Sequence, residues 1–548
     1  MAGWTFADVW EAIAEATPER PAQIQGTRVV SWRDFDRRAN ALAAHFVSKG
    51  LGHQAKVAAF LYNAPEYLET YYAAFKAGLA PVNTNYRYEP EELYYLFDNA
   101  DTEAVVFHAG FADKLAVIKD RLPGVKAWVA VAEPGATIPD WADEYESVAA
   151  AGADRFVAPW GRSGDDLLLL YTGGTTGMPK GVMWRQDDLF QVLGAGGNAA
   201  AGIPPLETAA EAAVRVTTGK AGDIVLPAPS TVVVACPLMH GTAQFGSFGA
   251  LTGGGCIVSL PSRRFDPVEL WNEVERTGAN SVSIVGMAFA TPMLEVLEAN
   301  PGRWDLSRVQ RLGSSGTVWS YENKQALLSH LPEGCVIFDS LGSSEAVGLG
   351  GSQSVKGAEA GTAQFLVGPN GAVFKEDGTR VEPGSGERGL VAVGGFIPVG
   401  YYKDPEKSAK TFREFEGRRW SLPGDFAEVN ADGTMKLLGR GSQVINTGGE
   451  KVFPEEVEEA LKQHPDVKDA VVVGIPDPRF GEKICAVVDV REGAAPTLAE
   501  FTAHLKGRLA DYKAPRALVL APVVRAPNGK VDYKGVRAEA LEALGVKG

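Results

Sequence analysis

The stretch LLLLYTGGTTGMPKG, residues 167–181, decides the fold. Its apolar run predicts a buried strand, and the strand leads directly into a loop of glycines and threonines. Glycines let backbone amides approach phosphate oxygens closely, while Thr172 and Lys180 add a hydroxyl and a positive charge. We therefore expect a phosphate-binding loop, with a flexible turn as the alternative. The spacing is not GxxxxGK[ST], which excludes the P-loop signature.

Length and charge narrow the class of protein. A chain of 548 residues exceeds what one hydrophobic core usually serves, so we expect two or more domains. With 53 basic and 68 acidic residues, the net charge is −15. This balance argues against nucleic acid as a partner and against broad docking on anionic lipid. A local basic groove for a phosphorylated ligand remains compatible with it.

The cysteines and the N-terminus indicate a cytoplasmic protein. The four cysteines form no CxxC pair, which favours buried reduced thiols over disulfides or a zinc site. The first residues lack a basic segment followed by an apolar one, so no signal peptide is predicted. No apolar run is long enough for a transmembrane segment. Peripheral membrane contact is left open.

Strands and helices alternate through residue 150. Residues 31–50 read as an amphipathic helix capped by Ser31, and this pattern continues as parallel βαβ units covered on both faces, an α/β fold. Residues 192–230 read as a partly helical or mobile insert. Residues 388–440 change to antiparallel strands and turns, and residues after 442 read as a compact α+β unit. Further strands are expected at 51–62, 79–85, 231–238, 254–260, 281–287 and 335–342, and further helices at 63–76, 89–100 and 498–510.

The segment YTGGTTGMPKGV, residues 171–182, resembles the phosphate loop of the adenylate-forming (AMP-binding) family. This family includes acyl-CoA synthetases, luciferases and peptide-synthetase adenylation domains. The resemblance covers essentially the whole chain and is greatest to bacterial acyl-CoA synthetases for fatty acids or steroid side-chain acids. It implies a large AMP-binding domain (1–439) of stacked sheets with a small antiparallel barrel-like part, a hinge (440–442) and a mobile C-terminal domain (443–548).

The segment DSLGSSE, residues 339–345, matches the family's tyrosine-glycine-x-threonine-glutamate element. The resemblance implies that Glu345, with Thr172, holds Mg²⁺ bridging the ATP phosphates, and that Asp339 reads the adenine amino group. Leu341 replaces the tyrosine that usually stacks on adenine, so the aromatic contribution is lost. A carboxylate at a helix start is the alternative for Glu345.

Other motifs complete the implied ATP site. In LPGD, residues 422–425, Asp425 would accept the ribose hydroxyls. Segment 313–317 would lie along the adenine and the acyl pocket, with a plain strand-to-helix turn as the alternative. The resemblance assigns to ATP Thr172, Gly173, Gly174, Thr175, Thr176, Gly177, Lys180, Ser315, Gly316, Asp339, Ser340, Leu341, Gly342, Ser344, Asp425, Arg440 and Lys530.

The resemblance gives the C-terminal domain two tasks. Ser442 would be the pivot of its rotation. Lys530, with Glu345 and Thr172, would be catalytic in adenylation. Gly448 and Gly449 would line the pantetheine tunnel of coenzyme A, and Arg479 would meet a CoA phosphate, with a solvated loop charge as the alternative.

His240, Gly246 and Gly316 match the family's acyl pocket, although a satisfied core histidine is an alternative for His240. Segment 241–249 is small and carries no carboxylate, which favours an aliphatic or alicyclic acid. The implied reaction joins a carboxylic acid to AMP from ATP, releases pyrophosphate, and passes the acyl group to CoA. The rival hypotheses are an enzyme that loads a carrier protein and an inactive nucleotide-binding relative. Whether the protein is a homodimer stays open.

Overall fold

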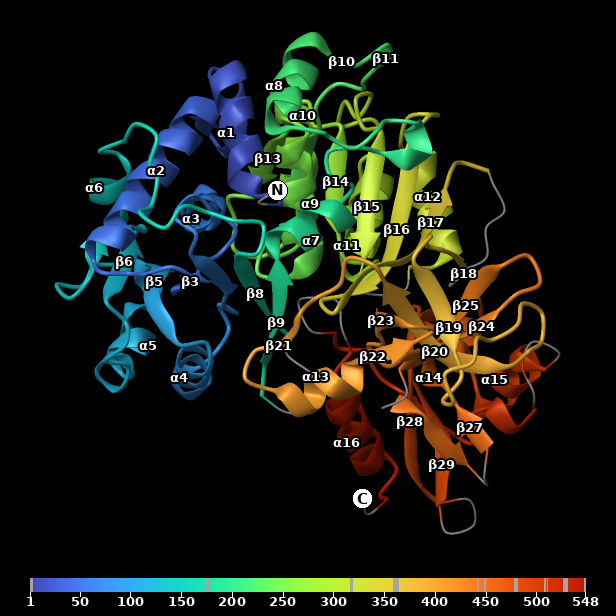
Figure 1. The fold of residues 1–548 in the computed structure, drawn as a ribbon. Coiled ribbons are helices and arrows are strands. Elements are labelled where there is room, and N and C mark those ends of the chain that lie inside the picture. The colour runs from blue at the N-terminus through green and yellow to red at the C-terminus, as the bar shows by residue number, and fades with distance from the viewer. Residues whose placement is uncertain are drawn as a thin grey trace.

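The computed structural model describes residues 3–172, 178–315, 319–357, 364–440, 443–447, 450–477, 481–506, 509, 511–525 and 531–546. Two large sheets with their helices form the N-terminal part, and a smaller sheet forms the C-terminal part (Figure 1). The predicted fold class is confirmed.

The eight-stranded sheet has the order β21-β9-β8-β4-β3-β5-β6-β7. Strands β3 to β6 run parallel, with helices α3 (Pro65–Lys76) and α4 (Pro90–Asn99) between them, as the alternating pattern predicts. Helix α2 (Trp32–Ser48) begins where the Ser31 hydroxyl accepts from the Asp34 amide at 3.0 Å. The strands are β3 (Lys56–Phe60), β4 (Ala80–Asn83), β5 (Thr102–His108), β6 (Ala127–Val131), β7 (Asp143–Glu144), β8 (Leu167–Thr172), β9 (Lys180–Arg185) and β21 (Gly400–Tyr401).

The second large sheet has parallel strands on one side and antiparallel strands on the other. Its β1, β13, β12, β14, β15 and β16 lie parallel, and from β16 onward neighbouring strands are antiparallel. The predicted antiparallel part therefore continues the same sheet. Its strands are β2 (Arg28–Ser31), β1 (Pro21–Gln25), β13 (Cys256–Ser259), β12 (Thr231–Val234), β14 (Ser281–Ile284), β15 (Arg311–Ser315), β16 (Val336–Ser343), β17 (Ala346–Ser354), β18 (Gln364–Val367), β25 (Thr434–Arg440), β24 (Asp425–Val429), β20 (Arg388–Gly394), β23 (Arg418–Ser421) and β22 (Phe412–Phe415), with β19 (Gly371–Phe374) beside β20.

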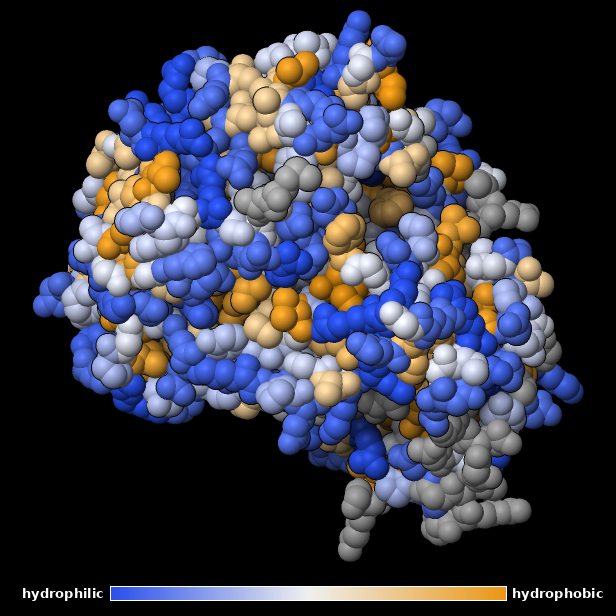
Figure 2. Space-filling model, viewed as in Figure 1, coloured by the Kyte–Doolittle hydropathy of each residue, from blue (hydrophilic) through white to orange (hydrophobic). Residues whose placement is uncertain are grey.

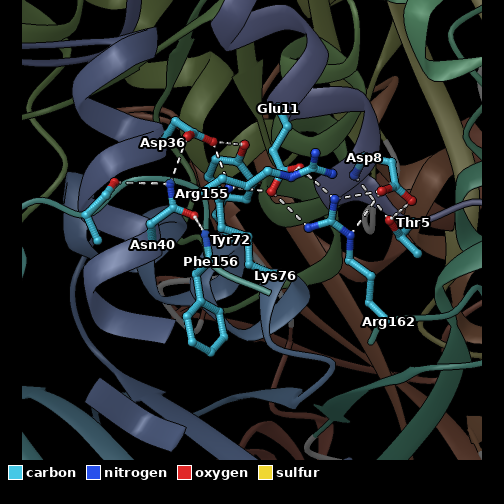
Figure 3. A network of polar contacts seen from close by, with 11 residues as sticks. Thr5, Asp8, Glu11, Asp36, Asn40, Tyr72, Lys76, Arg155, Phe156 and Arg162 are labelled. Atoms are coloured by element: carbon cyan, nitrogen blue, oxygen red, sulfur yellow. Dashed lines mark hydrogen bonds and ion pairs between the residues drawn. The ribbon is translucent and has the colours of Figure 1, made fainter. Parts of the chain in front are cut away.

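Buried helices hold the main core together. Rings of α1 (Phe6–Ala16), α3 and α9 (Gly241–Thr252) meet there: the centroid of Phe248 lies 5.1 Å from Phe6 and 5.7 Å from Phe75. Beside these rings, the buried Lys76 ammonium contacts Glu11 at 2.6 Å and Asp36 at 2.7 Å (Figure 3). A paired lysine can be buried there because opposite charges offset part of its desolvation.

The C-terminal sheet has the order β27-β26-β29-β28, with β30 beside β29. Helices α14 and α15 cover one apolar cluster and α16 covers another. The expected helix at 498–510 ends earlier, at Leu505, where Lys506 adopts an extended conformation before a glycine. The elements are β26 (Ile445–Thr447), β27 (Glu450–Val452), α14 (Pro454–Lys462), β28 (Val467–Asp477), β29 (Gly481–Val490), α15 (Leu498–Leu505), β30 (Ala517–Leu520) and α16 (Tyr533–Ala543).

The insert at 192–230 is partly helical, as expected: it contains α8 (Ala209–Thr218) and the hairpin of β10 (Lys220–Ala221) and β11 (Ile224–Val225). Val225 is 75% exposed, and apolar surface lies over this hairpin at the top of the face in Figure 2, which has other apolar areas nearer its middle. Within the described residues, no helix is long and apolar enough to span a bilayer. All four cysteines are free thiols and buried, as predicted.

Candidate functional site

The two flanks of the predicted phosphate loop face each other. Thr172 ends β8, Lys180 begins β9, and these residues are paired in the antiparallel ladder. The amide of the buried Asn83, at the end of β4, donates to the carbonyl of Tyr171 at 2.9 Å and to that of Met239 at 2.7 Å. Asn83 therefore fixes the strand that enters the loop and brings the chain before α9 beside it.

Lys180 forms an ion pair with Asp404. Asp404 also caps α13 (Pro405–Thr411), because its Oδ1 accepts from the Lys407 amide at 2.9 Å. The hydrogen bond from Lys180, with the capping bond, lowers the pKa of the Asp404 carboxyl. The loop lysine thus has a carboxylate partner from a distant part of the chain.

Glu345 lies in the two-residue turn between β16 and β17, so it does not start a helix. Its Oε1 accepts from the Tyr401 hydroxyl at 2.8 Å, and its carbonyl accepts from the buried Ser421 hydroxyl at 2.7 Å. The indole of Trp184, on β9, donates to the carbonyl of Ser344 at 2.9 Å. Three strands, β9, β21 and β23, therefore hold this turn; β9 and β21 lie next to each other in the middle of Figure 1.

Asp425 begins β24, four residues after Ser421, and stands opposite Arg440 in the ladder with β25. Contacts thus join Lys180, through β9 and β21, to Glu345 and Ser421, and four residues of chain lead from Ser421 to Asp425, which is paired with Arg440. The structure links Lys180 and Glu345 through β9 and β21 and pairs Asp425 with Arg440; the ligands assigned to these residues stay predictions.

The predicted adenine side lies on β15 and β16, where Ser315 is paired with Ser340. Asp339 is buried, and its Oδ2 accepts from the ammonium of Lys324 on α12 (Tyr321–Ser329) at 3.1 Å. Burial raises the pKa of this carboxyl to about 6, although the Lys324 charge opposes the shift. Leu341 packs partly buried against the main core.

Gly342 lies in a tight hairpin. A Cβ at this position would lie 3.1 Å from the carbonyl oxygen of Ala346. A larger residue would therefore need the hairpin that carries Ser344 and Glu345 in its turn to shift slightly.

Of the predicted acyl-pocket residues, His240 lies at the start of α9 and Gly246 lies within this helix. His240 is the N-cap residue of this helix. A Cβ added at Gly246 or Gly249 would meet no atom within 4 Å. These two glycines leave open space along α9, whereas a Cβ at Gly241 would lie 3.3 Å from Leu170 of β8.

Several predicted residues lie outside the described part of the chain: Gly173, Gly174, Thr175, Thr176, Gly177, Gly316, Ser442, Gly448, Gly449, Arg479 and Lys530. Sequence reasoning missed Asn83, Trp184, Tyr401, Asp404 and Ser421. The only signal for Asn83 was a polar residue directly after an apolar strand. The other four carry no local pattern.

Family models match most of the chain. The model described as "AMP-binding enzyme" matches residues 10–402, and the model described as "AMP-binding enzyme C-terminal domain" matches residues 456–530.

Curated relatives match along nearly their whole length. A "3-oxocholest-4-en-26-oate--CoA ligase" of Rhodococcus rhodochrous is 42% identical over 543 residues, which cover 96% of this chain and 94% of the relative. A "Medium/long-chain-fatty-acid--CoA/3-oxocholest-4-en-26-oate--CoA ligase" of Mycolicibacterium smegmatis is 40% identical, covering 96% of this chain and 95% of the relative.

The fold also resembles a solved structure, ATP-bound MatB from Rhodopseudomonas palustris. The TM-score is 0.77 at 23% identity, and the match covers 98% of this chain and 99% of that one. At this identity the likeness concerns the fold alone.

Proposed function

The chain belongs to the AMP-binding enzyme family, and on this premise we propose that it is an ATP-dependent acid–CoA ligase. The supporting observation is the set of contacts that joins Lys180 on β9 to Glu345 and Ser421, with the paired Asp425 and Arg440 following Ser421 in the chain. These groups come from separate sequence motifs. Together they would supply the Lys180 ammonium and the Glu345 carboxylate to the phosphate side of one nucleotide, and Asp425 and Arg440 to its ribose.

The first half-reaction forms an acyl adenylate. The substrate carboxylate attacks the α-phosphorus of ATP, a new P–O bond forms, and pyrophosphate leaves with the electrons of the broken P–O bond. Positioning and charge stabilisation supply most of the catalysis in such transfers. Thr172, the loop of Gly173–Gly177 and Lys180 would bind the phosphates, Asp425 and Arg440 the ribose, and Ser315, Gly316 and residues 339–344 the adenine.

Mg²⁺ fits the donor set around the turn. Within the described residues, no group of three His, Cys, Asp or Glu side chains is arranged to hold a metal by itself. Mg²⁺ commonly binds through one or two carboxylates plus substrate phosphates and water. Glu345 and Thr172 would hold it with the phosphates, and its charge would offset that of the triphosphate.

The second half-reaction transfers the acyl group to CoA. The CoA sulfur attacks the acyl carbon, the thioester forms, and AMP leaves. We place the large domain at 1–439, the hinge at 440–442 and the small domain at 443–548, since β25 ends at Arg440 and the C-terminal sheet begins at Ile445. Lys530 would serve the first step; Gly448, Gly449 and Arg479 would serve CoA after rotation about Ser442.

The proposed substrate is a medium- or long-chain fatty acid or a steroid side-chain acid, the classes named for the two relatives. The open glycine face of α9 and the absence of a carboxylate in 241–249 support an aliphatic or alicyclic tail beside His240 and Gly246. We also propose that the enzyme acts in the cytoplasm.

The test is pyrophosphate release by the full chain with short, medium, long-chain and steroid acids, with and without CoA. We expect release and thioester formation with at least one long or alicyclic acid. No release with any acid would exclude a ligase of this kind. Release without a CoA thioester would instead favour the carrier-protein hypothesis.

A further inference from the structure

Tyr401 is anchored to the strand that leaves the phosphate loop. Gly400 and Tyr401 form β21, which pairs with Met183 and Val182 of β9, and the next amide, of Tyr402, donates to the carbonyl of Gly181 at 2.8 Å. The Tyr401 side chain is 5% exposed. Its hydroxyl therefore projects from a fixed backbone position beside β9.

The contacts of the 344–345 turn are divided between backbone and side chain. Trp184 and Ser421 bind carbonyl oxygens of the turn, so they hold its backbone. In the part of the chain that the structure describes, the hydrogen bond to the Glu345 carboxylate itself comes from Tyr401, at Oε1. Tyr401 is thus the contact that selects among the side-chain conformations of Glu345.

We propose that Tyr401 is a positioning residue, which holds Oε1 of Glu345 so that Oε2 is presented to the cation on the ATP phosphates. This inference rests on the proposed function. A glutamate side chain has three rotatable bonds, and fixing them before the ligand arrives strengthens binding through the carboxylate. Groups that orient a metal-binding carboxylate typically change metal affinity or activity about 10- to 100-fold when removed.

The test variant is Tyr401→Phe, which keeps the buried ring and removes only the hydroxyl. Calorimetric binding of ATP to the full chain is measured across a Mg²⁺ series and in EDTA. We expect the Mg²⁺ concentration that gives half of the enhancement in ATP affinity to rise about 10-fold, with metal-free ATP binding unchanged. Unchanged metal-free binding also shows that the variant is folded.

The matched control is Tyr402→Phe. This neighbouring hydroxyl donates to Asp101 at 2.7 Å on the exposed surface and does not touch the turn. Its Mg²⁺ response should equal that of the unmodified protein.

A double-mutant cycle with Glu345→Gln tests whether Tyr401 acts through Glu345. We expect Tyr401→Phe to shift the Mg²⁺ response in the unmodified protein and to add no shift in the Glu345→Gln background. Equal shifts in both backgrounds, or none in either, would overturn the positioning role. If the unmodified protein still forms CoA thioesters in that case, the proposed function stands; if it releases no pyrophosphate with any acid, the proposed function itself fails.

Discussion

Asp404 uses its two carboxylate oxygens for two different purposes. Oδ1 caps α13 through the Lys407 amide, and Oδ2 pairs with Lys180. Asparagine caps a helix about as well as aspartate but carries no charge. The change Asp404→Asn therefore separates the cap from the ion pair.

We expect Asp404→Asn to bind ATP up to about 5-fold more tightly, because a half-exposed ion pair contributes roughly 0–1 kcal/mol and the phosphates no longer compete for Lys180. Calorimetric titration with ATP measures this. The control is Asp266→Asn, which caps α10 (Pro267–Thr277) through the Val268 and Glu269 amides. Weaker ATP binding by Asp404→Asn would show that the carboxylate aims Lys180 rather than occupying it.

Among single residues, short contiguous motifs led to the choice of Thr172, Lys180, Glu345 and Asp425, whose roles stay predictions. Tyr401 could not be predicted in the same way, because it meets Glu345 across 56 residues of chain. Ser421 meets the same residue across 76. No local period of apolar or polar residues encodes which distant side chains will touch.

Helix α9 offers the clearest test of substrate size at the scale of a single element. Residues three apart share a helix face, so Gly246 and Gly249 open the same side. Gly246→Leu should shift preference toward shorter acids, lowering kcat/KM for long chains about 10-fold or more by steric conflict. Thioester formation over a chain-length series measures this.

The companion variant Gly246→Ala separates volume from helix stability. It should keep the chain-length profile and stabilise α9 by about 0.5–1 kcal/mol, visible in thermal unfolding. An unchanged profile in Gly246→Leu would mean that this face of α9 does not line the acyl pocket.

The ionic network of Figure 3 makes the packing of α1 sensitive to acid. Burial would raise the pKa of Glu11, but the hydrogen bond from Arg162 and the charges of Lys76 and Arg162 together lower it to about 2. Because the folded pKa is below the ordinary value, Glu11 stabilises the fold above pH 4.5. This contribution is lost as pH falls from 4.5 toward 2.

The expected size of that contribution is about 3 kcal/mol. The measurement is the free energy of unfolding in urea between pH 6 and pH 3, for the unmodified protein and Glu11→Gln. The variant should lose less stability over this range, while the exposed Glu322→Gln should follow the unmodified protein. Identical pH dependence in Glu11→Gln would show that other carboxyls govern acid unfolding.

At the scale of the whole molecule, the N-terminal and C-terminal parts have separate hydrophobic cores. The buried clusters of described residues contain either positions up to 435 or positions from 445 onward. Contacts across the junction include the rings of Phe426 and Phe453, 5.5 Å apart, and Arg388, 5.6 Å from the Phe453 ring. The two parts therefore have separate apolar cores, and aromatic side chains make contact between them at the junction.

A fragment of residues 1–440 should fold cooperatively and bind ATP, but form no CoA thioester. Circular dichroism on heating, calorimetry with ATP and a thioester assay measure these three properties against the full chain. A fragment that aggregates or lacks a cooperative transition would show that the C-terminal part is needed for folding.

The sequence predicted the parallel βαβ units well, because strand and helix periods are local. It did not predict that the antiparallel strands would extend the same sheet as β16. That order depends on pairs such as β18 with β25, whose residues Gln364 and Lys436 are far apart in sequence. Residues 498–510 also read as one helix, since apolar spacing continued past the point where the backbone turns.

The burial of the cysteines bears on the thiol chemistry proposed for this enzyme. Burial raises the pKa of Cys236 and Cys256 to about 12 and that of Cys335 and Cys485 to about 11. At neutral pH almost none of these sulfurs is a thiolate, the form that attacks electrophiles. An acyl adenylate formed here would meet no competing protein nucleophile of this type, and oxidised CoA would find no partner for a mixed disulfide.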